Sequence, residues 1–261
     1  MSRLSVKIRA LRREIDNLRI SFNTARSIQK ELRRRSLAQR VIGARSLDNH
    51  IALAFDVLNR SHAQNLQDLF ALTELNMKRG GFFVEFGAAN GVNNSNTFLL
   101  ESQYGWSGIV AEPARCWHEA LLASRGCSVD LRCLWHTSGE MLEFSEADIG
   151  ELSTISRFAE IDEHAENRRN APRYQVETVS LNDLLAHHDA PSQIDYLSID
   201  TEGSEFDILK AFDFDRYDIC VITCEHNYTP QREKIHKLLS SKGYVRKCGE
   251  ISWMDDWYVR V

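Results

Sequence analysis

Residues 82–91 have the sequence FFVEFGAANG, in which a short apolar run leads into a turn with two glycines. The run FFVEF is rich in aromatic and β-branched side chains, which favour strands. Glycines in the turn let the backbone come close to a ligand that lies over the carboxyl ends of the strands. The stretch therefore predicts a strand over 82–86, a ligand-binding loop and a helix that begins near Ser95.

Strand-like and helix-like segments alternate through the rest of the chain. We expect further strands at 108–112, 129–135, 194–200 and 219–225, and helices near 96–104, 114–125, 180–188, 204–212 and 230–241. Several of these strands are apolar on both faces, which is typical of a parallel sheet covered by helices on both sides. The segments 244–248 and 253–261 leave no room for a crossover helix and predict a closing antiparallel hairpin. Together these patterns predict an α/β, Rossmann-like fold.

The N-terminal arm, residues 1–45, differs from the rest of the chain in charge. It carries 13 basic and 3 acidic side chains, whereas the remaining residues carry 19 and 34. Apolar residues recur at heptad spacing along the arm, which predicts a coiled-coil-like helix through which the chain forms a homo-oligomer. Alternatively, the arginines of the arm bind an anionic membrane surface or carrier polymer. After the arm we expect a linker and leading helix at 46–79, the latter starting near Ser61, and one domain at 80–261.

Composition excludes several classes of protein. The apolar runs are too short to span a bilayer and the N-terminus lacks a secretory signal, so a cytoplasmic location is expected. The six cysteines form no CxxC pair, which favours reduced thiols over a zinc site or disulfides. An acidic main domain disfavours nucleic acid as a partner. The polar stretch 145–173 predicts a surface insertion or lid.

The second predicted strand ends at Glu112, directly before Pro113. In a sheet of this kind its end lies beside the first loop, where a carboxylate accepts hydrogen bonds from both hydroxyls of a ribose. The loop itself lacks the GxGxxG of dinucleotide enzymes and the lysine of a P-loop. Loop and Glu112 together therefore indicate a nucleoside ligand without a pyrophosphate.

Further acidic residues follow the next two strands. Asp200 and Glu202 follow the strand at 194–200, and Glu225 and His226 end the strand at 219–225. Asp200, Glu225 and His226 would form a set suited to Mg²⁺ or Mn²⁺. A helix cap and a hydrogen-bonded histidine explain the same residues without a metal. His136, after the third strand, is a further candidate for the cleft.

Taken in order, these elements resemble the FkbM family of S-adenosylmethionine-dependent methyltransferases. The resemblance lies in QNLQDLF at 64–70, FFVEFGAANGVNNSNTFLLE at 82–101, GWSGIVAEP at 105–113, IDYLSIDTEGSEFDIL at 194–209 and CEHN at 224–227. It implies a class I methyltransferase fold with a seven-stranded, mostly parallel sheet. It also implies O-methyl transfer to a sugar, glycan or other small natural product. The residues expected to contact S-adenosylmethionine are Glu85, Phe86, Gly87, Ala88, Asn90, Gly91, Ser95, Asn96, Thr97, Glu112, Pro113 and Asp200.

Methyl transfer requires an acceptor oxygen in line with the methyl-sulfur bond and a group that takes its proton. A divalent ion on Asp200, Glu225 and His226 would lower the pKa of a bound hydroxyl. Without a metal, His226 or His136 is the expected base and Glu202 orients the acceptor. Two other kinds of protein are compatible with the same fold. One is a catalytically inactive scaffold in a glycan-assembly complex. The other is a nicotinamide-dependent oxidoreductase, which is disfavoured because the chain lacks a pyrophosphate-binding loop.

Overall fold

The computed structural model describes residues 57–58, 60–147, 150–159, 165–169 and 171–261. The arm, most of the linker and the predicted coiled coil lie outside these residues. Within them, no helix has the length and apolar character needed to cross a membrane.

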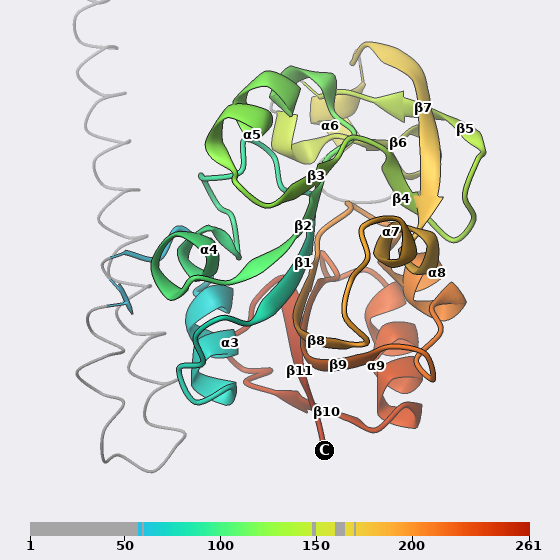
Figure 1. The fold of residues 1–261 in the computed structure, drawn as a ribbon. Helices are drawn as coiled ribbons and strands as arrows, with labels where there is room; N and C mark the ends of the chain where they lie inside the picture. The colour runs from blue at the N-terminus through green and yellow to red at the C-terminus, as the bar shows by residue number, and fades with distance from the viewer. Residues whose placement is uncertain (1–56, 59, 148–149, 160–164, 170) are drawn as a thin grey trace, which may run out of the picture.

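A seven-stranded mixed sheet forms the centre of the molecule (Figure 1). Its strand order is β10-β11-β9-β8-β1-β2-β3. The five strands from β9 to β3 run parallel, and β11 and β10 close the sheet as an antiparallel pair. The α/β class and the closing hairpin are confirmed. The strands are β1 (Phe82–Phe86), β2 (Ser107–Ala111), β3 (Ser128–Asp130), β8 (Gln193–Ile199), β9 (Asp218–Glu225), β10 (Tyr244–Lys247) and β11 (Asp255–Arg260).

Helices cover both faces of this sheet, because its strands carry apolar side chains on both sides (Figure 1). On one face, Val84, Leu197 and Ile222 pack with α7 (Leu181–His187), α8 (Glu205–Ala211) and α9 (Gln231–Ser241). On the other face, Phe83 and Tyr196 pack with α3 (Gln67–Glu74), α4 (Phe98–Tyr104) and α5 (His118–Ser124), which follows η1 (Arg115–Trp117).

The leading helix is shorter than predicted. Its cap is not Ser61 but Leu66, which has a φ of 64°, and the helix begins at Gln67. Ser61 instead donates a hydrogen bond to Asp68 Oδ1 at 2.8 Å, so this serine binds the helix through a side chain rather than capping it.

A second, four-stranded sheet was not predicted. Its strand order is β4-β7-β5-β6, and the single strand expected at 129–135 is in fact β3 and β4, which belong to different sheets. A small apolar cluster that includes Trp135, Phe144 and Ile155 holds this sheet together. Its strands and the short helices near them are β4 (Cys133–Trp135), β5 (Met141–Ser145), η2 (Gly150–Leu152), β6 (Thr154–Ile155), η3 (Ser156–Phe158), α6 (Ala165–Arg168) and β7 (Arg173–Ser180).

The loop after β1 passes directly against the end of β8. Gly87 has a φ of +71°, its N–H donates to Ala111 O at 3.1 Å, and a Cβ built on it would lie 1.9 Å from Asp200 O. No side chain fits at this position. The glycine that opens GAANG therefore allows the end of β1 to lie directly against the end of β8.

We expect Gly87→Ala to destabilise the protein by about 3 kcal/mol or more, because backbone strain and steric overlap add. Gly80→Ala is the matched control. Gly80 also has a positive φ, +66°, but an added Cβ there would meet no atom within 4 Å. It should therefore cost only about 1 kcal/mol. Urea unfolding of both variants measures the difference, and equal losses would contradict the steric argument.

Candidate active site

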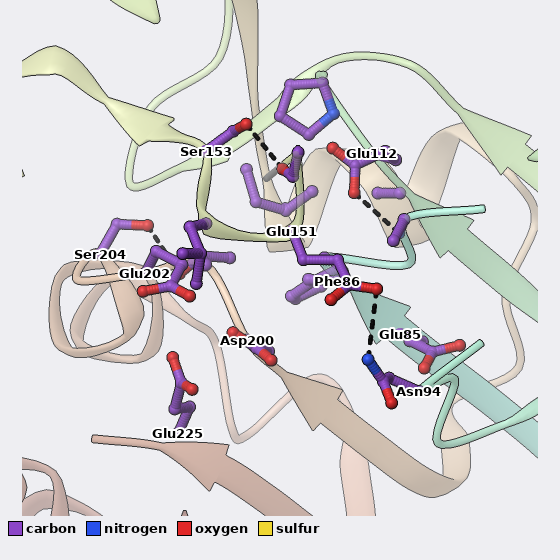
Figure 2. A pocket seen from close by; sticks show the side chains of 18 of the residues that line it. Glu85, Phe86, Asn94, Glu112, Glu151, Ser153, Asp200, Glu202, Ser204 and Glu225 are labelled. Atoms are coloured by element: carbon purple, nitrogen blue, oxygen red, sulfur yellow. Dashed lines mark hydrogen bonds between the residues drawn. The ribbon is translucent and has the colours of Figure 1, made fainter. Parts of the chain in front are cut away.

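A cleft opens at the edge of the main sheet where β1, β2, β8 and β9 end (Figure 2). Gly87, Glu112, Asp200 and Glu225, which end or follow these four strands, line it. The carboxyl ends of parallel strands meet at one edge, so residues far apart in sequence converge here. Other lining residues come from the start of α3, the segment after β3, the small sheet and the segment before β11: Gln64, Gln67, Cys133, Leu134, Phe144, Gly150, Glu151, Leu152, Ser153, Ile155 and Met254.

Glu85 is a buried carboxylate that organises the loop after β1. Its Oε2 accepts hydrogen bonds from the hydroxyls of Ser95 and Thr97, at 2.9 and 2.5 Å, and its Oε1 accepts from Asn96 N–H at 2.6 Å. The buried Arg125 guanidinium lies 3.4 Å from Oε2. Glu85 therefore holds the SNT stretch in place, and the loop is built around this carboxylate.

The residues predicted to contact a cofactor divide into two groups. Ala88 packs in the apolar core, Asn90 Oδ1 accepts from Val92 and Asn93 N–H, and Gly91 packs against α5. Ser95 and Thr97 bind Glu85 through their hydroxyls, so these five predicted residues shape the loop and none of them lines the cleft. The predicted residues that line it are Glu85, Phe86, Gly87, Asn96, Glu112, Pro113 and Asp200.

Glu112 connects the loop after β1 with the segment after β2. Its Oε2 accepts Ala89 N–H and its Oε1 accepts Ala114 N–H, both at 2.8 Å. Burial raises the pKa of this carboxyl to about 7, although the two N–H groups act in the opposite direction. Each oxygen can accept a second hydrogen bond, so the position suits a ligand with two neighbouring hydroxyls.

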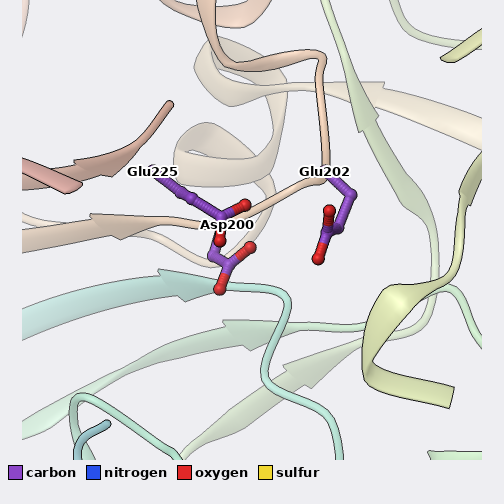
Figure 3. Close-up of side chains that lie close together, drawn as sticks. All are labelled: Asp200, Glu202 and Glu225. Atoms are coloured by element: carbon purple, nitrogen blue, oxygen red, sulfur yellow. The ribbon is translucent and has the colours of Figure 1, made fainter. Parts of the chain in front are cut away.

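Asp200 and Glu225 form a hydrogen-bonded carboxyl pair at the ends of the adjacent strands β8 and β9 (Figure 3). Burial raises the pKa of Asp200 to about 7, and burial together with the nearby Asp200 raises the pKa of Glu225 well above its ordinary value. Two buried carboxyls this close share one proton. The pair can accept a second proton near neutral pH, which is what a general base requires.

Glu202 lies next to this pair but has a different environment. Its Oε2 accepts hydrogen bonds from Arg168 at 2.8 Å and from Asn227 Nδ2 at 3.1 Å. The Arg168 side chain is fully buried. Asn227 Nδ2 also donates to Glu225 Oε2 at 2.8 Å, so one amide connects Glu202 to the carboxyl pair.

The predicted metal set is not assembled. His226 follows the end of β9, with Nδ1 accepting Tyr228 N–H and Nε2 3.8 Å from Asp256 Oδ1. Its side chain is therefore held by these partners, and it does not line the cleft as Glu225 does. Oxygens of Asp200, Glu202 and Glu225 lie within 4.8 Å of one another. Glu202 thus takes the place of the predicted His226 in the set of side chains whose oxygens could hold a cation.

His136 is also not brought to the cleft. It is exposed, its Nδ1 lies 2.6 Å from Thr137 Oγ1, and its ring contacts that of Trp135 at an angle of 47°. The cause is the split of the predicted strand, since β4 continues into the small sheet rather than ending at the cleft. Neither histidine predicted as a base lies at the site.

Comparison with known proteins gives the family. The methyltransferase FkbM domain matches residues 85–249. The chain belongs to the FkbM methyltransferase family. The matched segment contains all the cleft carboxylates from Glu85 to Glu225, whereas α3 and β11 lie outside it. No curated protein matches the sequence.

Similar solved structures include methyltransferases. An FkbM methyltransferase from Methylobacillus flagellatus KT is 13% identical, with a TM-score of 0.42 over 90% of this chain and 60% of that chain. A precorrin-6y C5,15-methyltransferase from Geobacter metallireducens GS-15 is 10% identical, with a TM-score of 0.40 over 74% and 85%. A mutant of MtNAS in complex with S-adenosylmethionine is 14% identical, with a TM-score of 0.32 over 87% and 72%. These TM-scores are too low to support a function. Membership of the family therefore rests on the matched FkbM domain alone.

In this FkbM family member, three residues of the site escaped sequence analysis. Arg168 lies in a stretch that has no strand or core-helix pattern, and for Asn227 the sequence predicts only a place at the same sheet edge as Glu225. Gln67 lines the cleft and donates to Asp255 Oδ2 at 2.6 Å, across 188 positions of sequence. These three residues differ from other polar residues in that each binds a buried side chain. That side chain is distant in sequence or on another element, so the contact can be identified only from the fold.

We expect Arg168→Met to destabilise the protein by about 3–5 kcal/mol, because it removes the buried guanidinium from Glu202. Adding Glu202→Gln should restore much of this loss, since a neutral amide needs no compensating charge. Arg169→Met is the control, because Arg169 forms an exposed ion pair with Glu166 and should contribute less than about 1 kcal/mol. Thermal and urea unfolding of the four proteins measure these values. A double variant less stable than Arg168→Met would contradict the charge argument.

Proposed function

We propose that this FkbM family member transfers the methyl group of S-adenosylmethionine to a hydroxyl of a sugar, glycan or related small natural product. The observation that carries the proposal is the proton-sharing pair of Asp200 and Glu225 in the same cleft as Glu112. One part of the cleft suits a nucleoside and the other suits the removal of a proton. Membership of a methyltransferase family supports the cofactor.

The cofactor would lie along the ends of β1 and β2. Glu112 would accept the two ribose hydroxyls, and Pro113, Leu134 and Phe144 offer apolar surface for the adenine ring. When bound, S-adenosylmethionine supplies a methyl group on a positively charged sulfur, which is already a strong electrophile. The protein must therefore orient an acceptor oxygen and accept its proton.

We assign the role of general base to Asp200 and Glu225 instead of His226 or His136. A sugar hydroxyl holds its proton tightly, so the base must act as the carbon-oxygen bond forms. The pair has a pKa near neutrality and lies among buried groups, where its charge is poorly screened. Glu202, fixed by Arg168 and Asn227, is placed to accept a hydrogen bond from a second hydroxyl of the acceptor.

We expect Glu112→Gln to weaken S-adenosylmethionine binding by about 10- to 100-fold, the effect of losing hydrogen bonds to a charged acceptor. Glu119→Gln, an exposed change in α5, removes the same charge away from the cleft and should leave the affinity unchanged. Isothermal titration calorimetry of the three proteins gives the dissociation constants. No binding by the unmodified protein would refute the proposed cofactor.

We expect the turnover rate to rise with pH through about 7, because the deprotonated pair is the active form and its pKa is raised. Asp200→Asn should lower turnover by about 100-fold or more while S-adenosylmethionine still binds. Glu225→Leu removes the neighbour whose hydrogen bond lowers the pKa of Asp200, so the pKa of Asp200 should rise and the rising limb should move to higher pH. Rate profiles from pH 5 to 9 measure both effects. A flat profile, or full turnover by Asp200→Asn, would remove the pair from the mechanism.

A further inference from the structure

The cleft has a one-sided charge distribution. Its lining includes six acidic residues, and none of the described lining residues is Lys, Arg or His. Protein sites that bind phosphates or carboxylates normally present arginine, lysine or several backbone N–H groups. The acidic lining residues are Glu85, Glu112, Glu151, Asp200, Glu202 and Glu225.

Partners within the protein cancel part of this charge where the acceptor would lie. Arg168 approaches Glu202 from the side of α6, with its guanidinium buried and away from the lining. Oxygens of Asp200 and Glu225 lie within 4.8 Å of each other, and burial raises the pKa of both, so the pair carries less than two negative charges near neutral pH. These three carboxyls therefore carry less negative charge than their number suggests.

This inference rests on the proposed function, because the cofactor contributes the balancing charge. The sulfonium of S-adenosylmethionine carries +1 and offsets the charge of these three carboxyls, whereas Glu112 and Glu151 add further negative charge to the lining. We infer that the acceptor is an uncharged polyhydroxy compound and that the cleft rejects acceptors with a phosphate or carboxylate group. One extra negative charge at about 6 Å, at an effective dielectric constant of about 20, would weaken binding by about 100-fold.

The transfer step keeps this balance. A bond forms between the acceptor oxygen and the methyl carbon, and the bond from that carbon to sulfur breaks with its electron pair left on sulfur. The sulfonium becomes a neutral thioether, and the hydroxyl proton moves to the pair of Asp200 and Glu225. The −1 of the carboxyl group and the +1 of the cofactor disappear together, so a neutral acceptor becomes a neutral ether.

Two features favour a polyol over an amine. An ammonium group has no lone pair and must lose a proton before it can attack, whereas a hydroxyl can donate to the carboxyls while its oxygen stays available. The carboxyl groups also offer several acceptor oxygens side by side, which suits neighbouring hydroxyls. Amino sugars are therefore included among the probes below, as the competing outcome.

The test uses the full chain loaded with S-adenosylmethionine, which carries the sulfonium charge, and matched pairs of ligands. N-acetylglucosamine is paired with its 1-phosphate, methyl glucoside with glucuronate, and glucose with glucosamine. Saturation-transfer NMR measures the binding of each member at 20 mM and 300 mM salt. We expect the neutral member of the first two pairs to bind at least about 10-fold more tightly than the anionic member at low salt, with a smaller ratio at high salt as charge is screened.

A charge reversal at the cleft checks that the lining causes this preference. Glu151 is an exposed lining residue that accepts from Asn94 Nδ2 at 3.2 Å (Figure 2). Glu151→Lys should strengthen binding of the phosphate and glucuronate probes several-fold at low salt. Glu119→Lys makes the same charge change outside the lining and should leave the ratios unchanged.

The outcomes separate this inference from the proposed function. Failure of S-adenosylmethionine and S-adenosylhomocysteine to bind would refute the proposed function. If they bind, tighter binding of an anionic member or of glucosamine, or binding by no member of any pair, would overturn the neutral-polyol inference alone. Equal effects of Glu151→Lys and Glu119→Lys would show that the charge of the cleft lining does not select the acceptor.

Discussion

The close approach of the β1 loop to the end of β8 is the constraint on which the site depends. A glycine at position 87 lets Asp200 O lie where any other residue would place its Cβ. This contact sets Asp200 beside the loop that Glu85 organises and beside Glu112 of the next strand. A larger residue at 87 would separate the nucleoside part of the cleft from the carboxyl pair, and both are needed for group transfer.

The carboxylates near this contact are stabilised in four ways. Glu85 accepts hydrogen bonds from the SNT stretch, Glu112 accepts two backbone N–H groups, and Glu202 pairs with Arg168. Asp200 and Glu225 lie against each other, and Asn227 Nδ2 donates to Glu225. A buried charge is tolerated when donors surround it, whereas two carboxyls that share a proton must titrate. The difference in partners therefore separates supporting carboxylates from the pair suited to proton transfer.

The small sheet contributes directly to the cleft although it lies outside the main sheet. Thr154 of β6 donates to Glu202 O at 2.9 Å, and Arg168 of α6 donates to the Glu202 carboxylate and to Leu152 O. These contacts hold the turn after β8 in place, where Glu202 has a φ of 56°. A non-glycine residue in this conformation is strained and needs surrounding contacts to maintain it. The segment 145–173, predicted as a surface insertion, thus forms one wall of the cleft and provides Arg168 as the cation that pairs with Glu202.

The α/β class, the closing hairpin and the positions of Glu112, Asp200 and Glu225 at strand ends can all be predicted from the sequence. These follow from local periodicity and from glycine turns, which depend on neighbouring residues only. Tertiary structure alone decided that His226 turns to Asp256, that His136 leaves the cleft with β4, and that Arg168 reaches Glu202. Each of these depends on which face of a strand a residue occupies or on a contact across distant segments. A shift of one residue in a strand reverses the face, and no local pattern records a partner 34 positions away.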